Sequence, residues 1–193
     1  MKRIVEAGQP HHVVRRRAGG EPVFFEDRDY VAYLEIMAEA CRDHGVEVLA
    51  YCLMPDHTHL VMVPVEGKNL SACMRQAHGR YSLYINERLG NTGSFWGGPF
   101  SSHLLDEIFL VRCVRYVEIN PVKRDYVAQA SDWPWSSARA HEAGEDNLLV
   151  NVMPLLERVK HPWREFLNEP RPDDEADLFY AHEKSGEPLV ESN

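Results

Sequence analysis

The segment over residues 55–63 has the sequence PDHTHLVMV, which places two histidines one residue apart in a run otherwise typical of a buried β-strand. Side chains on a strand alternate between the two faces of a sheet, so His57 and His59 are expected to point to the same side. Two imidazoles on one face can chelate a divalent cation or bracket a phosphate. An H-x-H pair alone fits two half-exposed surface histidines equally well, so a second feature is needed.

That second feature is a tyrosine and an asparagine four residues apart, in the segment RYVEINP over 115–121. On a helix, Tyr116 and Asn120 would share one face. They would supply a potential nucleophile and a further oxygen ligand. The alternatives are a tyrosine that only packs its ring and an asparagine that only caps the helix before Pro121.

The order of predicted elements favours an α+β fold. Strands are expected over 11–17, 46–53, 57–64 and 100–105, and helices over 27–45, from 69 or 71 to about 89, and over 106–120. Two split β-α-β halves of this kind give a ferredoxin-like antiparallel sheet with helices on one face. A helical or irregular C-terminal tail, with a short helix over 176–183, follows.

Composition indicates one globular domain with an extension. The chain has 193 residues, 44% of them hydrophobic, and no uninterrupted apolar run of the length that a membrane helix needs. The N-terminus lacks the apolar core of a signal peptide, and the four cysteines contain no C-x-x-C pair. We therefore expect a cytoplasmic protein without a membrane partner.

The net charge of −9 is unevenly distributed. Residues 1–140 carry 16 Lys and Arg against 17 Asp and Glu, whereas residues 141–193 carry 5 against 13. We therefore predict a catalytic domain over 1–140 and an acidic C-terminal extension over 141–193. Residues 1–140, whose positive and negative charges nearly cancel, can still carry a basic face that binds nucleic acid. Its candidate members, each of which could also be an ordinary solvated arginine, are Arg15, Arg16, Arg17, Arg75, Arg80, Arg112 and Arg115.

Together these residues suit phosphodiester chemistry. Neutral imidazoles bind divalent first-row metals, and an amide oxygen suits Mg²⁺ or Mn²⁺. A cation held by His57, His59 and Asn120 would keep open positions and act as a Lewis acid. Tyr116 could then attack phosphorus and form a phosphotyrosine, which conserves the bond energy for rejoining.

These motifs resemble the single-tyrosine HUH transposases, and in particular the REP-associated tyrosine transposases. The resemblance extends through the segments SFW (94–96), FSS (100–102) and DWPWSSA (132–138). It implies the HUH endonuclease fold, with His57, His59 and Asn120 as metal ligands and Tyr116 as nucleophile. It also implies nicking and rejoining of single-stranded DNA beside REP-like hairpins through a 5′-phosphotyrosine, by a monomer or a homodimer. Pro99 and Ser101 stand where this family often has basic residues.

Two other readings stay open. The more serious is a catalytically inactive, host-retained DNA-binding module on the same fold. The other is a metal-dependent phosphohydrolase, although residues 60–63 add no further ligand and no H-E-x-x-H motif occurs.

Other aromatic residues and histidines receive simpler interpretations. Trp96 could stack on unpaired bases, whereas Trp133 and Trp135 are expected to pack. His11 and His12 are predicted to be structural, and His103 could support the site from a neighbouring strand.

Overall fold

The computed structural model describes residues 5–170, 178–179 and 181 of the chain. The helix expected over 176–183 therefore lies mostly outside the described residues. None of the helices described is long and apolar enough to span a membrane.

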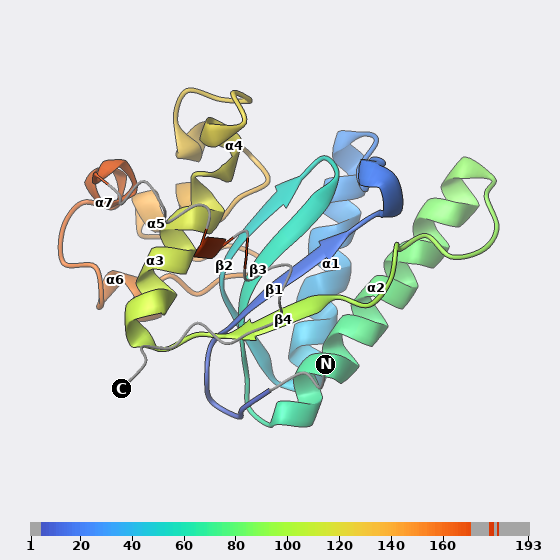
Figure 1. Ribbon diagram of the computed structural model, residues 1–193, viewed down its shortest axis with the longest axis horizontal. Coiled ribbons are helices and arrows are strands. Elements are labelled where there is room, and N and C mark those ends of the chain that lie inside the picture. Colours follow the sequence, from blue (N-terminus) through green and yellow to red (C-terminus); the bar gives the residue numbers. More distant parts are fainter. Residues whose placement is uncertain (1–4, 171–177, 180, 182–193) are drawn as a thin grey trace.

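One antiparallel sheet occupies the centre of the described structure (Figure 1). Its strands are β1 (His11–Arg16), β2 (Val46–Met54), β3 (His57–Pro64) and β4 (Ser101–Leu104), in the spatial order β2-β3-β1-β4. β2 and β3 form a hairpin, and β1 lies between β3 and β4. This arrangement confirms the predicted α+β fold.

Two long helices cover one face of the sheet. They are α1 (Asp27–His44) and α2 (Gly67–Leu89), and the short helix η1 (Ala18–Gly20) precedes them. α1 ends where Gly45 adopts a left-handed φ of 60°, as predicted, because a residue without Cβ takes this conformation at little cost. Buried side chains of both helices pack on Leu60 and Met62 of β3.

A different helix covers the opposite face. α3 (Glu107–Glu118) packs through Leu110, Cys113 and Val117 on a core that includes Cys52 of β2 and Val61 of β3. The prediction of helices on one face holds for α1 and α2 and is wrong for α3. The physical reason is visible in β2 and β3, whose nearly continuous apolar runs are those of strands buried on both faces.

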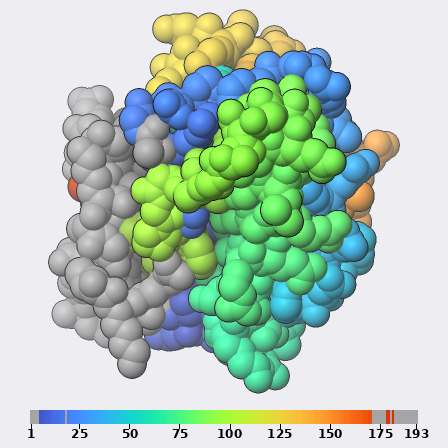
Figure 2. Space-filling view, turned by 90° about the vertical axis from the view of Figure 1, so that its right-hand side faces the viewer, coloured from blue at the N-terminus to red at the C-terminus, as the bar shows by residue number. Residues whose placement is uncertain are grey.

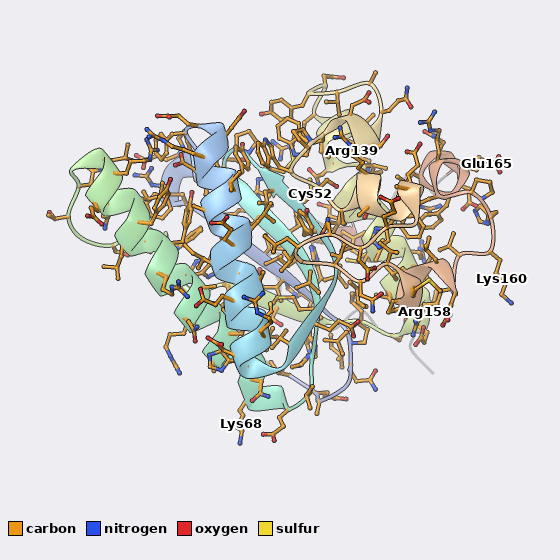
Figure 3. All side chains as sticks on the ribbon, turned by 180° about the vertical axis from the view of Figure 1, so that it is seen from behind. Cys52, Lys68, Arg139, Arg158, Lys160 and Glu165 are labelled. Carbon is orange, nitrogen blue, oxygen red and sulfur yellow. The ribbon has the colours of Figure 1, made fainter. Side chains whose placement is uncertain are left out.

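The chain beyond α3 packs around that helix (Figure 1). It forms α4 (Asn120–Lys123), η2 (Ala130–Asp132), α5 (Ala138–Ala143), α6 (Met153–Leu156) and α7 (Trp163–Asn168). Trp163 and Phe166 are buried in the α3 core, whereas Arg158, Lys160 and Glu165 project from the outer edge (Figure 3). The described part of the acidic extension thus shares a core with α3. The boundary at residue 140 stays a prediction.

One buried carboxylate joins α3 to this extension. Glu118 is fully buried, and its Oε1 accepts hydrogen bonds from Ser137 and from His141 Nδ1 at 2.7 Å. Its Oε2 accepts one from Trp163 Nε1 at 2.7 Å. Three donors from two later segments therefore hold the C-terminal end of α3.

We expect Glu118→Ala to destabilise the fold by roughly 3 kcal/mol or more, because removal of one partner leaves buried polar groups unsatisfied. Denaturant unfolding measures this change. Glu107→Ala is the matched control on the same helix, since Glu107 is 72% exposed in its pair with Arg158 and exposed ion pairs contribute little. Equal effects of the two substitutions would contradict the anchoring role of Glu118.

Candidate active site

β3 places the two predicted ligand histidines side by side beneath α3. His57 and His59 are both fully buried and share the sheet face that α3 covers. Their Nε2 atoms are 2.9 Å apart. Two ring nitrogens at this distance must share a proton or face a common cation, because two bare lone pairs would repel each other.

The outer nitrogen of each imidazole has its own partner. His57 Nδ1 lies 2.6 Å from Asp56 Oδ1, and His59 Nδ1 lies 3.0 Å from His12 Nε2. The hydrogen bond with His57 lowers the pKa of the Asp56 carboxyl to about 2. Burial, with a smaller contribution from His57, lowers the pKa of His59 well below its usual value. His59 is therefore neutral at pH 7, which is the state that a metal ligand requires.

α3 and α4 bring the tyrosine and the asparagine to the histidines. The centroid of the Tyr116 ring lies 5.7 Å from that of His59, and Asn120 Nδ2 lies 3.5 Å from His59 Nε2. α3 ends at Glu118 and Asn120 opens α4, so the predicted single helix over 106–120 is two helices. The two side chains nevertheless meet at one site.

Two further side chains touch Tyr116. Phe179 stacks on its ring at 4.9 Å, and Lys123 Nζ lies 5.6 Å from its centroid. Tyr116 is 8% exposed. The Tyr116 side chain is therefore enclosed by its neighbours, with Phe179 against one face of its ring.

The donor set suits a hard divalent cation with open positions. No group of three or more His, Cys, Asp or Glu side chains with metal-binding geometry occurs among the residues described. The candidate ligands are instead two imidazoles and the Asn120 side-chain amide. A 180° rotation of this amide group places its oxygen where its nitrogen now lies. Such a mixed nitrogen and oxygen set is compatible with Mn²⁺ or Mg²⁺.

The predicted DNA-binding arginines do not gather in one place. Arg16 lies opposite His57 in the β1–β3 register, on the site's face of the sheet. The positive charges of Arg16 and Arg124 both contribute to the lowered pKa of His59. Arg16 also lines a cavity of about 230 Å³ with Arg17, Ser101 and the glycine-rich loop before β4.

The remaining arginines have other positions. Arg15 lies over the Trp96 ring at 5.1 Å, and Arg112 lies over Phe109 at 5.4 Å. Arg115 is buried and pairs with Glu169 at 3.0 Å, so it joins α3 to the C-terminal segment. Arg75 and Arg80 are exposed on α2, across the sheet from the histidines. Figure 2 shows that α2 (green) forms much of one outer face.

The tryptophans pack. The indole N–H groups of Trp96 and Trp133 donate to the carbonyls of His78 and Leu53, both at 3.0 Å. Trp135 stacks on Tyr30 at 4.6 Å. The packing predicted for Trp133 and Trp135 is therefore observed, and Trp96 is also largely buried.

Sequence reasoning missed Asp56 and the position of His12. His11 ties the N-terminal segment through Glu6 and Gln9, as a structural histidine would, whereas His12 belongs to the site. The place of Asp56 directly before the H-x-H pair was an available signal. The pairing of β1 with β3, which brings His12 beside His59, has no signal in a single sequence.

Comparisons with known proteins indicate the family of this chain. The family described as "Transposase IS200 like" matches residues 8–124. A Haemophilus influenzae protein whose name assigns it to the REP-associated tyrosine transposases is 27% identical over 121 residues, covering 56% of this chain and 69% of that protein. The REP-associated tyrosine transposase of Escherichia coli is 30% identical over 98 residues, covering 50% of this chain and 56% of the relative. This chain therefore spans little more than half the length of the E. coli protein.

A solved structure shares the fold. It is described as a REP-associated tyrosine transposase bound to a REP hairpin, and it matches with a TM-score of 0.63 at 24% identity. The match covers 77% of this chain and 88% of the other. The family match over 8–124 includes the whole sheet, both histidines, Tyr116 and Asn120, and the chain belongs to the IS200-like transposase family.

Proposed function

We propose that this protein nicks and rejoins single-stranded DNA beside hairpin elements of the REP type, using a divalent metal and a 5′-phosphotyrosine intermediate. The observation that carries the proposal is the meeting of Tyr116 and Asn120, from α3 and α4, with His57 and His59 from β3. A nucleophile and a candidate metal site on separate elements converge on one point, as phosphoryl transfer requires.

The chemistry follows from these groups. Tyr116 Oη attacks the phosphorus, the P–O3′ bond breaks as the Oη–P bond forms, and the phenolic proton ends on the released 3′ hydroxyl. His57, His59 and Asn120 would hold Mg²⁺ or Mn²⁺, which supplies Lewis-acid polarisation of the phosphate. A free 3′ hydroxyl reverses the same step and rejoins a strand, with no net loss of phosphodiester bonds.

Positive side chains beside the site would orient the phosphate. Lys123 lies against the Tyr116 ring, and Arg16 and Arg124 are close enough to affect His59 electrostatically. Cations at this position attract the DNA backbone and favour the phenolate form of an attacking tyrosine.

A single-stranded substrate is favoured by the burial of the tyrosine. Tyr116 is almost completely buried, and an unpaired strand can enter where a rigid duplex cannot. The solved relative is described as bound to a REP hairpin, which supports the same class of DNA for this chain. The protein is expected to act as a monomer or a homodimer.

DNA affinity is expected to fall steeply with salt, because counterions are released when arginines contact phosphates. Arg16→Ala should reduce the slope of log K against log salt by about one unit. Arg75→Ala, on the far face, should leave the slope unchanged. Fluorescence anisotropy at several salt concentrations measures both. A smaller slope for Arg75→Ala would instead place DNA across α2.

The proposed function is tested by trapping its intermediate. Labelled single strands that flank a hairpin are incubated with the protein and Mn²⁺ and separated on a denaturing gel. A covalent protein–DNA band is expected, since a phosphotyrosine survives denaturation. Cleavage without such a band would indicate a phosphohydrolase.

A second candidate is a DNA-binding module that does not cleave. The observation that favours it is the enclosure of Tyr116, which is 8% exposed and has the Phe179 ring stacked on its own. Hairpin binding without cleavage, under every metal condition, would select this candidate.

A further inference from the structure

His59 is held from both edges of its ring. Its Nε2 faces His57 Nε2 at 2.9 Å, and its Nδ1 lies 3.0 Å from Nε2 of His12, a fully buried residue of β1. The ring planes of His12 and His59 are 14° apart and their centroids are 5.2 Å apart. Since the two nitrogens are much closer than the centroids, the hydrogen bond runs nearly in the plane of both rings, which is its favourable direction.

The backbone fixes this contact. β1 pairs with β3 so that Val14 is opposite His59 and His12 is opposite Val61. His12 and His59 are therefore diagonal neighbours on one sheet face, within reach of long side chains. His12 also makes ring contacts with Tyr116 at 6.2 Å and with His103, its partner on β4, at 6.2 Å. These contacts restrict the orientation of the His12 ring.

We propose that His12 is a positioning residue of the metal site, and this inference rests on the proposed function. With a cation at the site, the His59 Nδ1–H would donate to His12 Nε2, and His59 would keep the tautomer whose unprotonated Nε2 faces the ligand position. Asp56 has the corresponding role for His57, through Nδ1. Groups that orient a ligand histidine in this way commonly change metal affinity without touching the ion.

The structure favours orientation over direct ligation by His12. Its Nε2 is already engaged with the outer edge of His59, on the opposite side of that ring from the His57 contact. A cation bound to His59 Nε2 would therefore be separated from His12 by the His59 ring.

Two substitutions at His12 separate hydrogen bonding from packing. His12→Phe keeps a ring against Tyr116 and removes the acceptor, and it should weaken Mn²⁺ binding by about 10- to 100-fold. His12→Gln restores an acceptor oxygen and should recover most of that affinity. The matched control is His78→Phe, since His78 is a buried histidine on the other face, hydrogen-bonded to Tyr33 at 3.2 Å. It should leave Mn²⁺ affinity unchanged.

Calorimetric titration of the full chain with Mn²⁺, without DNA, measures the affinity, and circular dichroism checks the fold of each variant. Parental affinity in folded His12→Phe would overturn the positioning role while leaving the proposed function intact. A loss in both His12 variants as large as in His59→Ala would make His12 a direct ligand and also overturn it. Absence of Mn²⁺ binding by the parent protein would refute the metal site and the inference together.

Discussion

Tyr116→Phe is expected to abolish the covalent protein–DNA adduct, with a fall in its rate of formation of at least about 1,000-fold. The substitution removes one oxygen, the proposed attacking atom, and keeps the ring that stacks on Phe179 and meets His59 edge-on. Hairpin binding and the melting temperature should therefore stay close to the parental values. A denaturing gel measures the adduct, fluorescence anisotropy measures hairpin binding, and thermal unfolding gives the melting temperature.

The chain offers a matched control for this experiment. Tyr126 follows α4 and is 50% exposed, with its ring on Trp133, so Tyr126→Phe removes an accessible phenol from the same region. Tyr81 is a poor nucleophile because it is fully buried among α2 and α1 side chains and donates its hydroxyl to the Val23 carbonyl. An adduct that persists in Tyr116→Phe and disappears in Tyr126→Phe would transfer the nucleophile role to Tyr126.

The parts of this site that local patterns encode were predictable. The H-x-H pair lies on a strand because apolar β-formers follow it, and strand alternation puts both rings on one face. The spacing of Tyr116 and Asn120 likewise brings both to the histidines, even though the backbone changes from α3 to α4 between them. The helical i, i+4 spacing therefore predicts a shared face even across the break between α3 and α4.

What the sequence did not reveal depends on long-range pairing. His12 is 47 residues from its partner His59, and Phe179 is 63 residues beyond Tyr116. The position of α3 on the second face also depends on which strands pair. The charge of Arg115 favoured a DNA contact, but its buried guanidinium pairs with Glu169 and lies over the Phe166 ring. Charge alone does not distinguish a phosphate contact from an internal ion pair.

Mn²⁺ should raise the melting temperature of the parent protein and fail to do so in His57→Ala and His59→Ala. A ligand at 100 times its dissociation constant stabilises the folded state by about 2.7 kcal/mol, which corresponds to roughly 5–10 °C for a chain of this size. The metal-free protein should still unfold cooperatively, because the two hydrophobic cores include none of the three candidate metal ligands. Differential scanning fluorimetry with and without chelator measures the shift.

The same two substitutions should slow adduct formation by roughly 100-fold or more, since Lewis-acid stabilisation of a phosphoryl-transfer transition state contributes several kcal/mol. Loss of a buried ring also lowers intrinsic stability, so the decisive quantity is the difference between melting temperatures with and without Mn²⁺ within each variant. His161→Ala is the control, because His161 is 42% exposed and pairs with Glu169, and it should retain the full shift. A Mn²⁺ shift that survives in both His57→Ala and His59→Ala would place the metal elsewhere and leave Tyr116 without the electrostatic support that its chemistry needs.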